Sequence, residues 1–326
     1  MRVVVTGAAG FVGSHVCEEL LAAGHEVIGV DSFTRFYARE LKEANVARCR
    51  SHPRFTLLER DVVEGPLPEA DAIVHLAGRP GVRCGSPELF TAANVRTTEA
   101  VLRSPVRRVV LASSSSVYAP ARGPVGEDAP LAPRSPYGRS KLAAERVAVR
   151  LARERGIELV RLRYFTVYGP RQRPDMAFSR FVAAARSGEP APLLGDGRQV
   201  RDFTYVGDAA AATRLALTDG RPGAVYNVSG GAPTTLADAL ALIARATGGE
   251  PPLEPRPPDP REHRATAADL TRAMADLGWA PVVSLEEGIR RQVAAAEERD
   301  AALAAAGPDG TGDRVAPAEA RTTLRA

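Results

Sequence analysis

Short runs of apolar, often β-branched residues alternate along the chain with longer segments rich in Ala, Leu, Glu and Arg. Such alternation is typical of parallel strands joined by helices. The runs are apolar at nearly every position, which indicates a sheet covered on both faces. The expected strands are 2–6, 25–31, 72–78, 108–114 and 158–165, with a further buried strand at 224–230. We therefore predict an α/β fold built on a doubly wound parallel sheet.

The pattern changes near residue 167, where Pro and Gly punctuate the chain and the helices 177–188 and 234–248 are expected. Residues 1–166 should form the first domain, and the segment of about 200–230 should rejoin it. Residues 167–299 should form a smaller, partly discontinuous C-terminal α/β lobe. Residues 300–326 show no apolar period and are expected to be a disordered tail.

Composition and charge exclude several classes of function. The 43 Lys and Arg against 39 Asp and Glu give a net charge of only +4, and the arginines are spread along the chain without interleaved aromatics, so nucleic-acid binding is not expected. No apolar run approaches the roughly 18 residues of a membrane span. Three scattered cysteines and the lack of an apolar leader predict a cytoplasmic location. No metal-ligand spacing occurs among His15, His25, His52, His75 and His263.

Three glycines separate the first expected strand from the first helix. Gly7, Gly10 and Gly13 stand in "TGAAGFVGSH", and the turn they allow lets backbone approach a pyrophosphate at a helix N-terminus. Asp31 ends the second strand, where its carboxylate can accept both hydroxyls of an adenosine ribose. The pattern therefore predicts a Rossmann sheet that binds NAD, with Arg35 close enough in sequence to soften the exclusion of NADP.

A tyrosine and a lysine lie four residues apart in "SPYGRSK", so a helix places Tyr137 and Lys141 on one face. A neighbouring ammonium and an oxidised nicotinamide would lower the pKa of the phenol and make Tyr137 a base. Ser114 ends the fourth expected strand in "LASSSSVY", at the edge where ligands of such sheets bind. Ser114 can then share a hydrogen bond to a reacting hydroxyl while Tyr137 takes its proton.

Together these motifs resemble the extended short-chain dehydrogenases/reductases of the NAD-dependent sugar epimerase/dehydratase family, over nearly the whole chain. The resemblance rests on "TGAAGFVGSH", "HLAG", "AANVRTTEA", "SSSSVY", "YGRSK", "RYFTVYGPRQRPDM", "GDGRQVRDFTYVGD" and "LGWAPVVSLEEGI". Ala119 stands where the family usually has Gly after the signature Tyr118.

The resemblance implies NAD as cofactor and a homodimer formed through the helices that carry Asn94 and Tyr137. The expected catalytic residues are Tyr137, Lys141 and Ser114. The expected cofactor-binding residues are Gly7, Gly10, Phe11, Val12, Gly13, Asp31, Asp61, Val62, Leu76, Ala77, Asn94, Tyr137 and Lys141. Asp61 is equally well interpreted as a capping residue.

Membership of the family leaves the reaction open among epimerisation, dehydration, decarboxylation and reduction. Dehydratases of this family carry an Asp-Glu pair two and three residues before the signature tyrosine, and decarboxylases usually carry a Glu there. This chain has Ser115 and Ser116 instead. An epimerase needs no second proton-transfer group, so epimerisation at the sugar C4 is favoured.

The sugar is predicted from Thr166, which stands where UDP-glucose 4-epimerases typically have Asn. Thr166, the following Pro-Asp-Met run, residues 31–45 and "GVR" at 81–83 resemble UDP-glucuronate 4-epimerases. The hydroxyls of Ser115, Ser116 and Thr166 can donate hydrogen bonds to a C6 carboxylate, which would leave the sugar ring free to rotate because no ion pair holds it. Alternatively, Thr166 only packs under the nicotinamide. Arg83 is a candidate for the carboxylate or for a scaffold role.

The nucleotide is expected to meet polar residues of the second lobe, by resemblance to the family. Arg201 matches a diphosphate-binding arginine, because its planar fork suits phosphate oxygens. The further candidates are Gln199 near the ribose, Arg173 near the sugar or phosphate, and Glu262 with Arg264. We therefore expect a UDP-glucuronate 4-epimerase. UDP-glucose 4-epimerase is the alternative, a nucleotide-sugar dehydratase or decarboxylase is less favoured, and a catalytically silent NAD-binding protein is disfavoured by the complete catalytic set.

Overall fold

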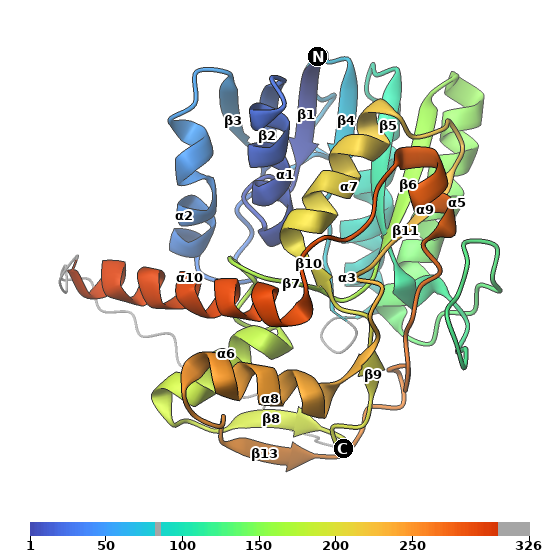
Figure 1. The fold of residues 1–326 in the computed structure, drawn as a ribbon. Helices are drawn as coiled ribbons and strands as arrows, with labels where there is room; N and C mark the ends of the chain where they lie inside the picture. Colours follow the sequence, from blue (N-terminus) through green and yellow to red (C-terminus); the bar gives the residue numbers. More distant parts are fainter. Residues whose placement is uncertain (82–85, 306–326) are drawn as a thin grey trace, which may run out of the picture.

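The computed structural model describes residues 1–81 and 86–305. A parallel seven-stranded sheet in the order β11-β6-β5-β4-β1-β2-β3 forms its centre (Figure 1). The strands are β1 (Arg2–Thr6), β2 (Glu26–Asp31), β3 (Phe55–Glu59), β4 (Ala72–His75), β5 (Arg108–Ser114), β6 (Glu158–Tyr164) and β11 (Val225–Val228). The predicted doubly wound parallel sheet is therefore confirmed, and the segment 224–230 supplies the edge strand beside β6.

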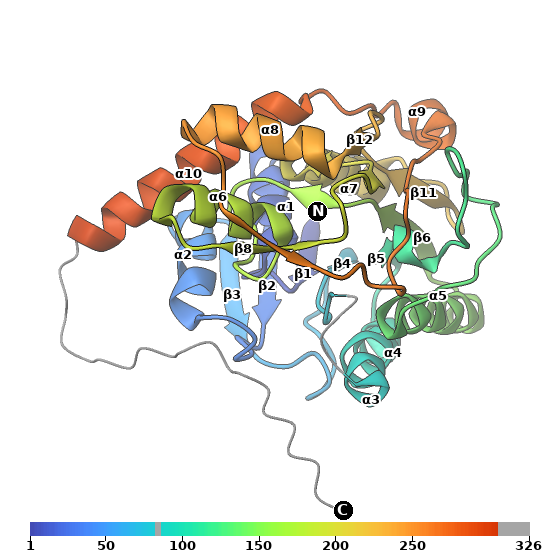
Figure 2. The ribbon, with the colours of Figure 1, turned by 90° about the horizontal axis from the view of Figure 1, so that it is seen from below.

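Helices cover both faces of this sheet (Figure 2). The helices α1 (Phe11–Ala22) and α7 (Val206–Thr218) share one apolar core with Val3 and Val5, whereas α4 (Thr97–Arg103) and α5 (Pro136–Arg155) share another with Val4. Successive side chains of a strand point to opposite faces, so "VVV" in β1 needs apolar neighbours on both sides. The helix α2 (Arg39–Arg50) lies beside α1 at the β3 edge.

A smaller lobe lies below the carboxyl ends of the strands in Figure 1. Its apolar core includes Phe178, Phe181, Ile243 and Ile289. The lobe contains α6 (Ala177–Ser187), β8 (Ala191–Leu194), α8 (Leu236–Thr247), β13 (Leu253–Arg256) and α10 (Leu285–Ala305), with β13 parallel to β8. The strand pairs β7 (Val167–Tyr168) with β10 (Thr204–Tyr205), and β9 (Val200–Arg201) with β12 (Thr234–Thr235), connect it to the sheet, and α9 (Thr271–Leu277) packs near β11.

The helix α10 continues to Ala305, so residues 300–305, which were assigned to a disordered tail, are helical. Alanine has the highest intrinsic helix propensity, and an Ala-rich segment can prolong a helix without any apolar period. The rest of that predicted tail lies outside the described residues. Among the helices of the described part, none has the length and apolar character needed to cross a membrane.

Candidate active site

The glycine turn between β1 and α1 leaves no room for a side chain at Gly7 or Gly13. Gly7 has a φ of +72°, and a Cβ on Gly13 would lie 2.0 Å from the carbonyl oxygen of Gly7. Gly10 caps α1 with extended backbone and no side chain, so the N–H groups of Phe11 and Val12 head the helix. These groups have no partner within a helix. The cradle therefore fits a pyrophosphate at the positive end of α1.

Asp31 ends β2 beside this turn. Its two oxygens accept hydrogen bonds from the backbone N–H of Ala9 at 3.0 Å and of Phe33 at 2.9 Å. Burial raises the pKa of the Asp31 carboxyl, whereas these hydrogen bonds and the charge of Lys42 oppose the increase. An ionised carboxylate offers about four acceptor sites, so capacity remains for ribose hydroxyls. The side chain also fixes the turn and the segment after β2, a role that the sequence did not reveal.

Asp61 and Val62 follow β3, and the structure gives both a local role. The Asp61 carboxylate accepts a hydrogen bond from the N–H of Val63 at 3.1 Å, as in an Asx turn. Val62 is buried in the apolar core that contains Val30. The hydrogen bond from Val63 supports the interpretation of Asp61 as a capping residue, and the binding of the cofactor by Asp61 stays a prediction.

Leu76 and Ala77, which follow β4, border the turn, whereas Asn94 lies behind the loop that they begin. Ala77 donates its N–H to the hydroxyl of Thr6 at 3.2 Å, and a Cβ on Gly7 would lie 2.8 Å from that same nitrogen. Leu76 donates to the Thr6 carbonyl at 3.2 Å. Asn94 is buried in the π-helix Thr91–Arg96 and donates to the Ser140 hydroxyl at 2.9 Å. It thereby connects the loop after β4 with α5, close to the catalytic helix turn.

The fold brings the three predicted catalytic residues to the carboxyl end of β5. Ser114 is the last residue of β5, and it lies close enough to Tyr137 for its side chain to lower the pKa of that phenol by hydrogen bonding. Tyr137 lies in the first turn of α5, which Ser135 caps by accepting from the N–H of Gly138 at 3.0 Å. Lys141 donates from Nζ to the carbonyl of Ala112 at 2.8 Å. Two side chains of one helix thus hold the end of one strand.

Burial controls the proton affinities of this group. It raises the pKa of Tyr137, against the opposing effects of the Ser114 hydrogen bond and the Arg173 charge. It lowers the pKa of Lys141 to about 8, with Glu145 acting in the opposite direction. The expectation that Lys141 lowers the pKa of Tyr137 is therefore not met by the protein's own groups, because the ammonium is directed at the Ala112 carbonyl.

A buried polar network lies behind these residues, and sequence reasoning missed it. Glu145 stands one helical turn after Lys141 and accepts hydrogen bonds from Arg163 at 3.0 and 2.9 Å and from the Ser113 hydroxyl. Arg163 also donates to the Tyr118 hydroxyl at 3.0 Å. The spacing of Lys141 and Glu145 was a signal that both side chains share one face of α5.

The expected hydroxyl cluster is divided between two segments. Ser115 and Ser116 lie in the 3₁₀ turn Ser115–Val117 directly after β5, and Thr166 follows β6, with its carbonyl accepting from the N–H of Thr204 at 3.1 Å. All three side chains are half-buried. The two segments follow adjacent parallel strands, which brings them to the same edge of the sheet.

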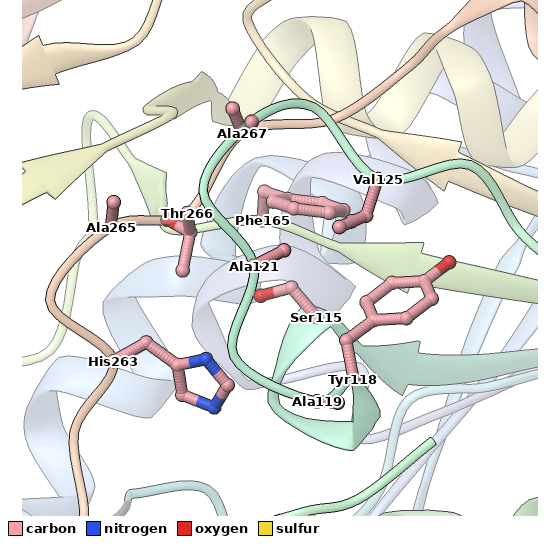
Figure 3. A pocket seen from close by; sticks show the side chains of 11 residues that line it. Ser115, Tyr118, Ala119, Ala121, Val125, Phe165, His263, Ala265, Thr266 and Ala267 are labelled. Carbon is pink, nitrogen blue, oxygen red and sulfur yellow. The ribbon is translucent and has the colours of Figure 1, made fainter. Parts of the chain in front are cut away.

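Ser115 lines a cavity of about 20 Å³, which can hold about one water-sized group (Figure 3). Tyr118, Ala119, Phe165, His263 and Thr266 are among the residues of its wall. Ala119, the departure from the family pattern, thus places its methyl group on this wall. From the sequence, His263 was considered only as a metal ligand, and its position at this cavity was not predicted. The pKa of His263 is lowered by burial and by the charges of Arg134 and Arg201.

The nucleotide candidates of the second lobe lie together around β9. Arg201 forms an ion pair with Glu262 at 3.1 Å, and Val200 donates its N–H to the carbonyl of Arg264 at 3.0 Å. Gln199 donates to the carbonyl of Leu194 at 2.8 Å. The structure therefore brings the predicted residues Arg201 and Glu262 into direct contact, although 61 residues separate them.

Arg173 is the candidate whose charge acts on Tyr137, because it lowers the pKa of that phenol. Its guanidinium donates from Nε and Nη2 to the two oxygens of Asp175, at 2.9 and 2.8 Å. Arg83 lies outside the described residues.

Comparisons with known proteins agree with this geometry. Residues 3–229 match the NAD dependent epimerase/dehydratase family. A Bacillus subtilis protein described as an uncharacterized UDP-glucose epimerase, YtcB, is 37% identical over 309 residues, which are 90% of this chain and 97% of that protein.

Two solved structures illustrate the range of the family. A UDP-glucuronic acid 4-epimerase from Bacillus cereus, solved with UDP-glucuronic acid and NAD, has a TM-score of 0.88 and 34% identity and covers 92% of this chain and 100% of its own. A dTDP-glucose 4,6-dehydratase, DesIV from Streptomyces venezuelae, has a TM-score of 0.86 and 31% identity, with 92% and 98% covered. The chain is therefore an enzyme of the NAD-dependent epimerase/dehydratase family, with NAD as its cofactor.

Proposed function

We propose that this enzyme is a 4-epimerase that interconverts UDP-glucuronate and UDP-galacturonate. The observation that carries the proposal is the turn after β5, where the Ser114 hydroxyl accepts a hydrogen bond from the N–H of Ser116 at 3.2 Å and hydroxyls stand at positions 115 and 116 in place of acids. This arrangement supplies one proton-transfer group, Tyr137, and lacks the additional acid and base that the elimination of water requires. The Bacillus cereus neighbour, solved with UDP-glucuronic acid, supports the choice of sugar.

In this proposal Tyr137 takes the proton of the C4 hydroxyl, and Ser114 shares the hydrogen bond that orients this hydroxyl. An NAD held by the glycine turn and Asp31 would supply, when bound, the acceptor and donor of the C4 hydrogen and its electron pair, so that this hydrogen can return to the opposite face of the sugar. Lys141, held by the Ala112 carbonyl, supplies positive charge at the foot of α5. Tyr137 then returns the proton to the oxygen of the inverted carbon.

The proposed substrate also explains why the sugar end carries hydroxyls. Ser115, Ser116 and Thr166 donate neutral hydrogen bonds to the C6 carboxylate, so the ring is oriented without being fixed by an ion pair. The 4-keto intermediate must rotate about its phosphate linkage, and as a β-keto acid it loses CO₂ when its carboxylate turns out of plane. Arg201, paired with Glu262, holds the diphosphate around which this rotation occurs.

The test is to incubate the purified enzyme separately with UDP-glucuronate and UDP-glucose and to resolve the sugars. We expect UDP-galacturonate from the first. The variant Tyr137→Phe should abolish turnover, since the ring is kept and only the hydroxyl is lost, while its NAD content stays that of the wild type. Conversion of UDP-glucuronate with release of CO₂, or full activity of Tyr137→Phe, would contradict the proposal.

UDP-glucose 4-epimerase is the second candidate, and the description of the Bacillus subtilis relative favours it. The same incubation separates the two, because UDP-galactose forms only if the C6 hydroxymethyl group is accepted. A higher kcat/KM for UDP-glucose than for UDP-glucuronate would select this second function.

We also propose that the enzyme is a homodimer through α5 and its neighbours. Leu89 of α3 (Pro87–Phe90) and Val149 of α5 are large apolar side chains that are 41% and 42% exposed, and a partner subunit on these helices would cover them. Light scattering of the full chain should give twice the monomer mass. A monomer at micromolar concentration would refute this assembly.

A further inference from the structure

One aromatic ring joins two arginines from distant parts of the chain. Phe36 lies in the segment 33–37 after β2, which we call the aromatic strap. The guanidinium carbon of Arg79 is 4.4 Å from the centroid of the Phe36 ring, and that of Arg173 is 5.3 Å away. Arg79 belongs to the loop after β4, and Arg173 to the segment after β7. The ring therefore connects three segments at the carboxyl edge of the sheet.

The strap is fixed at its base. Phe33 is buried and has a φ of 46°, a conformation that few residues other than glycine adopt, and its N–H is held by Asp31 at 2.9 Å. The Tyr37 ring packs edge-on against Phe36 with centroids 6.5 Å apart, and the Lys42 ammonium lies 4.9 Å from the Tyr37 centroid. Packing of this kind gives Phe36 a defined position without regular secondary structure.

Arg79 is held equally firmly. Its backbone N–H donates to Asn94 Oδ1 at 2.8 Å, and its carbonyl accepts from Asn94 Nδ2 at 3.1 Å. The Phe36 ring thus contacts Arg79, which Asn94 holds in place, and it also contacts Arg173.

Two neighbours constrain the Arg173 guanidinium. Asp175 occupies Nε and Nη2, and the Phe36 ring contacts the group, while Nη1 makes no hydrogen bond within the described residues. The side chain of Arg173 is only 11% exposed. An arginine held in this way loses little rotamer freedom when it binds an anion, so its remaining donors are already oriented.

We propose that Phe36 is a positioning residue that holds the Arg173 guanidinium so that Nη1 faces the anionic part of the nucleotide sugar. The proposal rests on the proposed function for the identity of that anion, a uronate carboxylate or a phosphate. Phe36 itself touches neither the substrate nor the reacting carbon. Its effect is exerted through the orientation of Arg173.

A double-mutant cycle tests this role in the full-length enzyme with its NAD bound. The variants are Phe36→Leu, Arg173→Met and the double mutant, and the binding of UDP-glucuronate is measured by calorimetry alongside KM and kcat. One cation–π contact has a strength that corresponds to about 2- to 30-fold in affinity. We expect Phe36→Leu to weaken binding and raise KM within that range while kcat changes less than about twofold.

Two further results are expected. Phe36→Tyr, which keeps an aromatic face for the guanidinium, should restore the wild-type affinity. In the Arg173→Met background, Phe36→Leu should cause no further loss, because the contact it removes is already absent. If Phe36→Leu unfolds or loses NAD, Phe36→Met retains more flexible apolar volume and is judged by the same coupling criterion.

Additive losses in the cycle would overturn the positioning role, as would equal losses from Phe36→Tyr and Phe36→Leu. These outcomes are distinct from failure of the proposed function. If the wild type binds UDP-glucuronate without epimerising it and the cycle shows coupling, the reaction assignment fails and the positioning role stands. Normal epimerisation with additive losses rejects the positioning role alone.

Discussion

The buried ion pair of Glu145 and Arg163 offers the sharpest test of how the catalytic elements are held together. Each side chain is 3% exposed, and Arg163 donates to Glu145 at 3.0 and 2.9 Å. The pair joins α5, which carries Tyr137 and Lys141, to β6. The variant Glu145→Gln keeps the shape, removes the charge, and turns an NH₂ group toward the guanidinium or the Ser113 hydroxyl.

The expected loss in the free energy of unfolding is about 3 to 5 kcal/mol, the usual cost of leaving one member of a buried ion pair uncompensated. The matched control is Glu154→Gln on the same helix. Glu154 pairs with Arg150 at 3.0 Å, but the two side chains are 52% and 55% exposed, so this change should cost about 0.5 kcal/mol or less. The contrast isolates burial, since helix and residue type are the same.

Urea denaturation followed by the fluorescence of Trp279 is a suitable assay, because this single tryptophan is 3% exposed and packs in the core with α7. Burial alone would raise the pKa of Glu145, but its hydrogen bonds to Arg163 and the charge of that residue outweigh burial and lower it. The contribution of the carboxylate is therefore fully present above the ordinary pKa of about 4.5 and is lost as the pH falls through the lowered folded value.

The difference between wild type and Glu145→Gln should consequently be constant from pH 6 to 8 and narrow in acid below about pH 4.5. A loss of less than about 1 kcal/mol, or one no larger than that of Glu154→Gln, would refute the reasoning that this pair is held as a buried charge.

Two further predictions concern the glycine turn and Lys141. Gly13→Ala places a Cβ 2.0 Å from the Gly7 carbonyl oxygen, so we expect α1 to shift away from β1. The amount of NAD retained by the purified protein should then fall at least about tenfold. An unchanged NAD content, measured by absorbance, would contradict this prediction. Burial lowers the pKa of Lys141 to about 8, below its ordinary 10.5, so the folded state loses this proton first and wild type should gain stability relative to Lys141→Met between about pH 8 and 10.5; thermal melts with a pH-independent difference would exclude it.

The sequence by itself predicted those features that depend on neighbours along the chain. The apolar runs gave the parallel strands, since a strand covered on both faces must be apolar at every position. The glycines of the first turn identified a cofactor cradle, because only residues without a Cβ permit that backbone approach. The four-residue spacing placed Tyr137 and Lys141 on one helix face, since an α-helix has 3.6 residues per turn.

The sequence was less informative about what those residues contact. It placed Tyr137 beside a lysine and predicted that this ammonium, together with an oxidised nicotinamide, lowers the pKa of the phenol. Among the protein's own groups burial raises that pKa and Lys141 is bonded to Ala112, so the effect of the cofactor stays a prediction. A pKa depends on the direction of a side chain and on solvent exclusion, and neither is encoded in the spacing. The position of His263 was likewise not predicted, because Ser115, Tyr118 and Phe165, which line the same cavity, come from segments that are far away in the sequence.

Only the tertiary structure decided which distant residues meet. The contacts of Phe36 with Arg79 and Arg173, of Glu145 with Arg163, and the pairing of β11 with β6 all join segments whose local patterns would suit other partners equally well. Local backbone preferences act over a few residues and can be seen in a short stretch of sequence. Long-range contacts are selected by the joint packing of the whole chain. The carboxyl edge of the sheet, the aromatic strap and the second lobe therefore form one site only in the folded protein.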